Sequence, residues 1–198
     1  MAEDISDMTN DPNSIATMKK FYNDRLYVGD KDSLAEELLG GNDRSTIITI
    51  ASHAEIHTET LIGFSLPHLR TAEEKDWTLT FRHEGPLGTF SACIDMAFYL
   101  TLIDQALRDQ LHNLRDMRNA VAHTKRRVTF EDAQLQNVAL RLFAPKGQFK
   151  LLNDTADGFR RTFIAEGLFI SSILVFGREA AVTKSRDSFT KSGLKAPF

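Results

Sequence analysis

A clear helical period runs through ALRDQLHNLRDMRNAVAH, residues 106–123, and it predicts the fold class. At about 100° per residue, its leucines and one valine fall within a narrow arc of a helix, at Leu107, Leu111, Leu114 and Val121. Arg118 falls in the middle of this arc, where the period calls for an apolar residue. Because burying an unpaired guanidinium is costly, we expect Arg118 to meet a carboxylate, backbone carbonyls, a ligand anion or a water-filled groove. Glu55 and Asp95 are the candidate carboxylates.

Helical periods continue on both sides of this stretch. They predict an all-α fold, a single helical bundle domain over residues 14–183. Asp43 is the expected cap of the long helix that Pro67 ends, because proline cannot continue the hydrogen-bond ladder. The alternation at residues 78–81 predicts a short strand. The expected helices cover residues 14–26, 33–39, 45–64, 90–105, 106–123, 130–143 and 156–182.

The two ends of the chain differ from this domain in charge. Residues 1–13 predict a flexible, acidic N-terminus, and residues 184–198 predict a flexible, basic tail. Of the 198 residues, 42% are hydrophobic and 26% are charged, and the net charge of −3 gives no global positive field for nucleic acid. We find neither a secretory signal nor the apolar run of about 20 residues that a membrane span needs. A cytoplasmic protein without membrane contact is therefore expected.

A second face of the helix expected at residues 106–123 carries a candidate catalytic site. Asn119 and His123 are four residues apart and share this face, which adjoins Arg118. Arginine offers a fixed fork of donors to a phosphate, histidine can move a proton near neutral pH, and asparagine can orient either group. The alternative is structural, with Arg118 in a buried ion pair and His123 capping the helix end. The expected nucleic-acid contacts are Arg115, Lys125, Arg126 and Arg127.

Three segments resemble the mannitol-operon-repressor family, in this order: GPLGTFS at 85–91, LID at 102–104 and LRDMRNAVAH at 114–123. The resemblance covers roughly residues 45–142. Arg118 and His123 also resemble the Arg-x4–6-His motif of the wider HEPN superfamily. The resemblance implies a HEPN-like or mannitol-repressor-like helical bundle. It also implies a homodimer, because HEPN proteins commonly form one.

This resemblance leaves two functions open. The mannitol-repressor branch implies a bacterial regulator of transcription that lacks a recognisable DNA-binding motif and works through a protein partner. The HEPN ribonucleases imply a metal-independent endoribonuclease of the toxin or defence type, in which two subunits share one cleft. There Arg118 would stabilise the phosphate, His123 would act as acid or base, and Asn119 would position them while a ribose 2′-hydroxyl attacks. Two positions depart from the related motifs, since Val121 replaces a frequent aromatic residue and Cys93 an expected basic one.

The remaining motifs predict neither a metal site nor a cofactor. His53 and His57 have a spacing that can ligate zinc, but no third ligand follows, so we expect a solvent-facing pair. Cys93 is expected to be a small core residue, and Arg160 to lie on a solvated face. The last helix predicts core or dimer interface, with these side chains inward: Phe159, Phe163, Ile170, Ile173 and Leu174.

Overall fold

The computed structural model describes residues 31–70, 74–82, 84–143 and 155–191. The chain divides into two compact units, Met1–Leu34 and Ala35–Phe198, and only the last four residues of the first unit are described. The described residues form helices and no strand, which confirms the all-α prediction. The helices are α2 (Lys31–Gly40), α3 (Asp43–Ser65), α4 (Pro67–Arg70), α5 (Glu74–Phe81), α6 (Phe90–Tyr99), α7 (Gln105–His123), α8 (Ala133–Phe143) and α9 (Ala156–Lys191).

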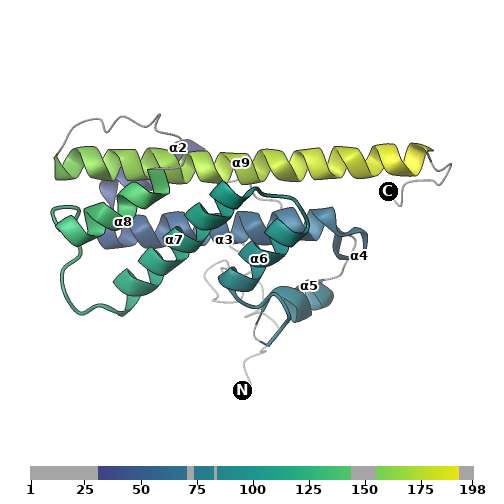
Figure 1. Cartoon of the computed structure of the whole chain (residues 1–198), viewed down its shortest axis with the longest axis horizontal. Coiled ribbons are helices and arrows are strands. Elements are labelled where there is room, and N and C mark those ends of the chain that lie inside the picture. The colour runs from purple at the N-terminus through teal and green to yellow at the C-terminus, as the bar shows by residue number, and fades with distance from the viewer. Residues whose placement is uncertain (1–30, 71–73, 83, 144–154, 192–198) are drawn as a thin grey trace, which may run out of the picture. The chain divides into compact units, whose positions relative to one another are not determined.

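The most extensive packing between two described helices is that of α3 and α9, which lie side by side and run in the same direction (Figure 1). Small residues on α9 allow the close approach. A methyl group added at Gly167 would clash with Ile50, and one added at Gly177 would touch Leu61. The order of these two contacts along both helices fixes the parallel direction. The bundle therefore rests on a parallel pair whose connection, α4 to α8, covers it from one side.

The core lies where α6, α7 and α8 cover this pair. α7 contributes the predicted apolar arc, and all four of its expected residues are buried, together with Met117. Phe130, in the loop before α8, packs on Phe163 of α9 with ring centroids 5.4 Å apart. Gln110 Nε2 of α7 donates to the carbonyl of Leu142 in α8 at 2.6 Å. The 3.6-residue period thus predicted the buried side of α7 correctly.

Polar side chains at helix starts fix where the elements begin. The cap of α3 is Asn42, whose side chain accepts from the Ser45 amide, and the prediction of Asp43 as cap is wrong by one residue. Asp43 instead accepts from the Phe130 amide at 2.8 Å and lies 3.2 Å from the guanidinium of Arg160. Asp104 caps α7 by accepting from the Leu107 amide. Asp43 therefore links the start of α3 to the loop before α8 and to α9.

Several expected boundaries differ from the structure. Residues 78–81 belong to α5, because Trp77 and Phe81 are both buried one helical turn apart, with ring centroids 4.6 Å apart. The helix expected at 90–105 ends at Tyr99, since Thr101 adopts a left-handed φ of 57° that breaks the ladder. α8 begins at Ala133 instead of residue 130, and α9 continues to Lys191, so part of the expected tail is helical. The helix expected at 14–26 and the acidic end at 1–13 lie outside the described residues.

Arg160 is not on the solvated face that was expected for it. Its guanidinium donates to the carbonyls of Leu38, Leu39 and Gly41, which lie at or just beyond the end of α2. These carbonyls have no partner within a helix, so a cation there satisfies them and complements the helix dipole. Arg160 therefore fastens the start of α9 to the turn between α2 and α3. Arg161, one residue later, is exposed as expected and pairs with Asp157.

None of the described helices combines the length and the apolar character that crossing a lipid bilayer would require.

Candidate functional site

Arg118 lies between α7 and α3, with less than a quarter of its side chain exposed. Its Nη1 donates to Oε2 of Glu55, whose side chain is 24% exposed against 23% for Arg118. The guanidinium carbon also lies 5.7 Å from the centroid of the Phe90 ring, within cation–π distance. The expectation that Arg118 meets a carboxylate is confirmed, and the carboxylate is that of Glu55. The cation in the apolar arc of α7 is therefore neutralised inside the chain.

Asp95, the other candidate, serves a different network between α6 and α7. Its Oδ1 accepts from Arg108 Nη2 at 2.6 Å and from Arg108 Nε at 3.0 Å, and lies 3.2 Å from His112 Nε2. Burial raises the pKa of Asp95, but the hydrogen bonds from Arg108 and His112 outweigh it and hold the pKa below its ordinary value. The guanidinium of Arg108 also lies 4.8 Å from the centroid of the Phe98 ring. Asp95 is thus a surface-network carboxylate and not a partner of Arg118.

Arg115 extends this network along α7. Its Nη1 donates to Ser91 Oγ at 2.6 Å and lies 3.1 Å from His112 Nδ1, and its Nη2 donates to Asp116 at 2.6 Å. Because an arginine only donates, Nδ1 of His112 is the acceptor and Nε2 carries the proton offered to Asp95. These contacts direct the donors of Arg115 within the chain. Its expected role in binding nucleic acid stays a prediction.

Asn119 and His123 are exposed at the end of α7, and neither side chain makes a hydrogen bond to the described part of the chain. At about 100° per residue, they are turned roughly 100° and 140° around the helix from Arg118. One copy of the chain therefore directs Arg118 to Glu55 and the other two side chains to solvent. The three residues of the candidate catalytic site are neighbours in sequence but do not converge within one copy. The cap at this helix end is Thr124.

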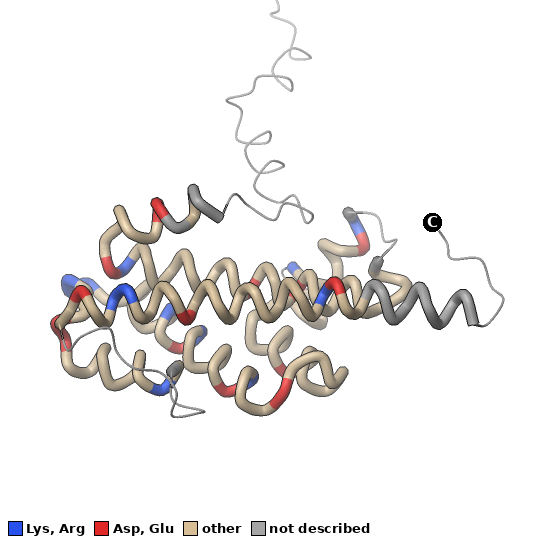
Figure 2. The backbone as a smooth tube through the Cα atoms, turned by 90° about the horizontal axis from the view of Figure 1, so that it is seen from above, with Lys and Arg blue, Asp and Glu red and all other residues tan. Residues whose placement is uncertain are grey.

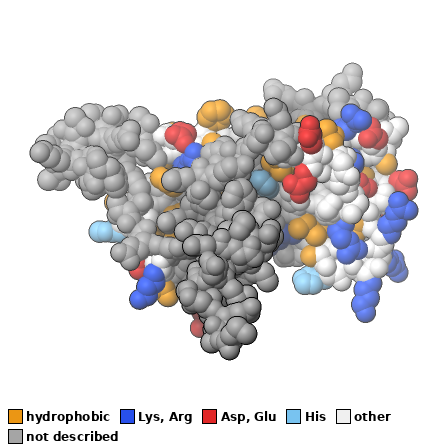
Figure 3. Space-filling model, turned by 180° about the vertical axis from the view of Figure 1, so that it is seen from behind, with side chains coloured by type: hydrophobic (Ala, Val, Ile, Leu, Met, Phe, Trp, Pro, Cys, Tyr) orange, Lys and Arg blue, Asp and Glu red, His pale blue; other side chains and the backbone are white. Residues whose placement is uncertain are grey.

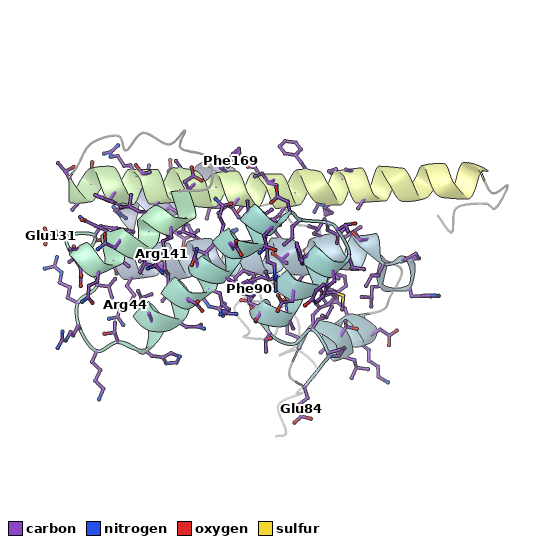
Figure 4. The ribbon with its side chains drawn as sticks, viewed as in Figure 1. Arg44, Glu84, Phe90, Glu131, Arg141 and Phe169 are labelled. Atoms are coloured by element: carbon purple, nitrogen blue, oxygen red, sulfur yellow. The ribbon has the colours of Figure 1, made fainter. Side chains whose placement is uncertain are left out.

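A basic end of the bundle adjoins His123. Arg44 of α3 donates to the carbonyl of Arg126 at 2.6 Å and so fastens the loop after α7. Sequence reasoning missed Arg44, because its position in the chain gives no sign that it meets residues about 80 positions later. Figure 3 shows basic side chains gathered at one end of the molecule, the end at which Figure 4 places Arg44. The members of this basic end are Arg44, Lys125, Arg126 and Arg127, and the last three are exposed.

An open pocket of about 430 Å³ lies at the basic end. Its wall combines two cationic side chains with one carboxylate, that of Asp43, which already accepts from Phe130 and faces Arg160. An anion bound in this pocket would lie close to the negative charge of Asp43, which would weaken its binding. The lining residues are Asn42, Asp43, Arg44, Arg127, Val128 and Thr129.

The histidine pair His53 and His57 and the single Cys93 form neither a metal site nor a nucleophile among the described residues. The rings of His53 and His57 lie 6.1 Å apart and are half-buried, so the expected solvent-facing pair is wrong in its exposure. Burial, with the charges of His53 and Arg178, lowers the pKa of His57 to about 4. Within the described residues no three side chains are grouped to hold a metal ion. Cys93 is buried as expected, and burial raises its pKa to about 12, so its thiol is a poor nucleophile.

No protein-family model, curated protein or solved structure matches the chain. The all-helical class rests on the structure itself. The resemblance to the mannitol-operon-repressor family and to the HEPN superfamily stays a prediction.

Proposed function

We propose that this chain is a bacterial, cytoplasmic regulatory protein of the mannitol-operon-repressor type. It acts in the control of transcription by binding another protein, without catalysis and without a DNA-binding motif of its own. The observation that carries the proposal is the pairing of Arg118 with Glu55 across α7 and α3. The cation that a phosphate would need is engaged in holding two helices together.

The strength of this pairing decides between a structural and a catalytic role. A guanidinium can stabilise a phosphate only when its donors point at the anion. Here Nη1 of Arg118 points at Glu55, whose carboxylate is mostly buried and would lose its cation if the guanidinium turned to an anion. Removing one partner of such a pair is unfavourable, because the other charge stays desolvated. The geometry therefore favours Arg118 as a structural residue.

The second candidate is the metal-independent endoribonuclease, and one observation favours it. His123 and Asn119 are exposed beside the basic end, where an RNA backbone would find cations. In this role His123 would move the proton, while Arg118 of a second copy would turn from its Glu55 to the phosphate. No cofactor or metal ion is needed for that reaction. This candidate therefore requires a dimer that joins the two α7 ends.

Cleavage of RNA in the presence of EDTA separates the two candidates. The purified chain, its His123→Ala variant and a His68→Ala control are incubated with structured and unstructured RNA. His68 is exposed on α4, away from α7, and so controls for loss of an exposed histidine. We expect no cleavage above background from any of the three proteins. Cleavage by the parent and by His68→Ala, but not by His123→Ala, would overturn the regulator and establish the nuclease.

A further inference from the structure

One face of α9 is apolar and exposed. It carries five side chains that recur at helical spacing: Ala165, Phe169, Ile173, Phe176 and Ala180. We name these residues the α9 stripe. At about 100° per residue they fall within roughly 80° of the helix circumference. Phe169 is 61% exposed and Phe176 is 70% exposed, although both are aromatic.

The α9 stripe lies beside the buried face of α9 and not within it. The core side chains of this helix include Phe163, Ile170 and Leu174, which are almost fully buried. Ile173 was expected among them, but it is exposed because the neighbouring helices cover only one side of α9. The last helix therefore has more apolar residues than the described core can cover.

The surface of α9 around the stripe has little exposed charge. Between Arg161 and Glu179 the charged residues are Glu166 and Arg178, and both are largely buried: Glu166 is 6% exposed and the Arg178 side chain is 12% exposed. The sequence has no charged residue from Gly167 to Gly177, and Figure 2 shows this long uncharged interval on the α9 tube. Single exposed apolar residues are ordinary on a protein surface, but a contiguous row of them marks an interaction site. The α9 stripe meets that description.

The order of residues in the α9 stripe is nearly symmetric about its centre. Read in either direction, the stripe is Ala, Phe, Ile, Phe, Ala, with Ile173 at its centre. Two identical helices that cross antiparallel at this isoleucine place Phe169 beside the partner's Phe176, and Ala165 beside the partner's Ala180. A two-fold interface requires this kind of self-complementary surface, in which one patch serves both subunits. We propose that the α9 stripe binds the same stripe of a second copy of this chain, with the two helices antiparallel.

The size of the contact fits a dimer that depends on concentration. An aromatic side chain has roughly 200 Å² of surface, so Phe169 and Phe176 together offer about 250 Å² on each copy. A stable interface covers about 800 Å² on each partner, so the flanking residues must supply the rest. Ala165, Ile173 and Ala180 of the stripe and the half-buried Leu168 and Ser172 beside it add to the two rings, so the contact through this stripe alone is smaller than a standard interface. The dimer should form at micromolar or higher concentration and dissociate on dilution.

This dimer differs from the one that the nuclease needs. Figure 4 places Phe169 on the edge of α9 away from the side where Arg44 lies, and Figure 1 shows α7 ending far from α9. Pairing through the α9 stripe thus leaves His123 of each copy outside the interface. The proposal does not depend on the regulatory role, and it would hold whichever partner or reaction the basic end serves.

The molar mass of the full chain in solution tests the interface. Light scattering after size exclusion, over a range of concentrations, should give about twice the 22.3 kDa of one chain at the highest concentration. The variant Phe169→Glu/Phe176→Glu should stay at one chain with unchanged helicity. The control Leu79→Glu/Tyr99→Glu removes exposed apolar residues of the same exposure, 61% and 70%, and should stay dimeric. A monomeric parent, or a stripe variant that still dimerises, would overturn the proposal.

Cysteine cross-linking tests the direction of the two helices. In the antiparallel pair, Ala165→Cys mixed with Ala180→Cys should form an intermolecular disulfide under mild oxidation. Ala165→Cys alone should not, because 15 residues of helix separate the two sites by about 22 Å, and a disulfide spans only about 6 Å between Cα atoms. Cys93 is buried and does not interfere. Self-cross-linking of Ala165→Cys would mean a parallel pair and would contradict the proposal.

Discussion

Two helices of this bundle break their own pattern in opposite ways. α7 carries a cation, Arg118, in the middle of an apolar arc, whereas α9 carries aromatic residues on an exposed face. The cation finds Glu55 of α3, so its departure from the pattern is satisfied within the chain. The aromatic residues Phe169 and Phe176 find no cover in the described part of the chain. The first departure therefore explains how the fold is held, and the second indicates where the fold meets another molecule.

The difference has a physical basis. A buried charge must be paired at once, because desolvation without a partner costs several kcal/mol and would prevent folding. An exposed apolar side chain only forgoes the roughly 25 cal/mol per Å² that burial would supply, which a folded monomer tolerates. A charged side chain within an apolar pattern is thus paired inside the same domain. An apolar side chain on a polar surface can stay exposed until another molecule covers it.

The two faces of α9 should respond very differently to the loss of a phenyl ring. Phe163→Ala removes a ring that is 1% exposed and packed on Phe130, and should lower the free energy of unfolding by about 3–5 kcal/mol. Phe169→Ala removes an exposed ring and should change it by less than about 0.5 kcal/mol. Urea unfolding at low protein concentration measures both. Equal losses would show that Phe169 is buried within one copy, which would erase the contrast between the two faces.

His57 is half-buried and stays uncharged at neutral pH, unlike Arg118, which is charged and paired. Its pKa in the folded chain is about 4, against the ordinary 6.5 of the unfolded chain. Between these values the unfolded state binds a proton that the folded state refuses, so stability falls as the pH drops from about 6.5 to about 4. The loss should approach about 3 kcal/mol. His57→Gln should remove most of it, whereas His68→Gln, at an exposed site, should not.

Urea unfolding at pH 7 and pH 4.5 measures this difference for the parent and both variants. If His57→Gln and the parent lose the same stability on acidification, then His57 is not held neutral by the fold. In that case the contrast with Arg118, which keeps its charge by pairing, would fail.

The sequence predicted most of α7, because one period controls both its shape and its burial. Alternation at residues 78–81 misled the prediction of a strand, since large side chains four residues apart fit a helix as well. The partner of Arg118 was narrowed to two carboxylates, but only the packing of α7 on α3 selects Glu55. Arg44 and Arg160 were beyond prediction, because their partners are carbonyls and loops that lie far away along the chain. The exposure of Ile173 depends on how much of α9 its neighbours cover, which the period alone does not contain.

The coupling energy between Glu55 and Arg118 measures whether this pair holds α7 on α3. A double-mutant cycle of Glu55→Ala, Arg118→Ala and both together, followed by urea unfolding, isolates the energy of the pair. We predict a coupling of about 1–2 kcal/mol, with the double variant much less destabilised than the sum of the single variants. A coupling near zero, with Arg118→Ala as stable as the parent, would contradict a structural role for Arg118. Arg118 would then be free for an anion, and the candidate catalytic site would regain its arginine.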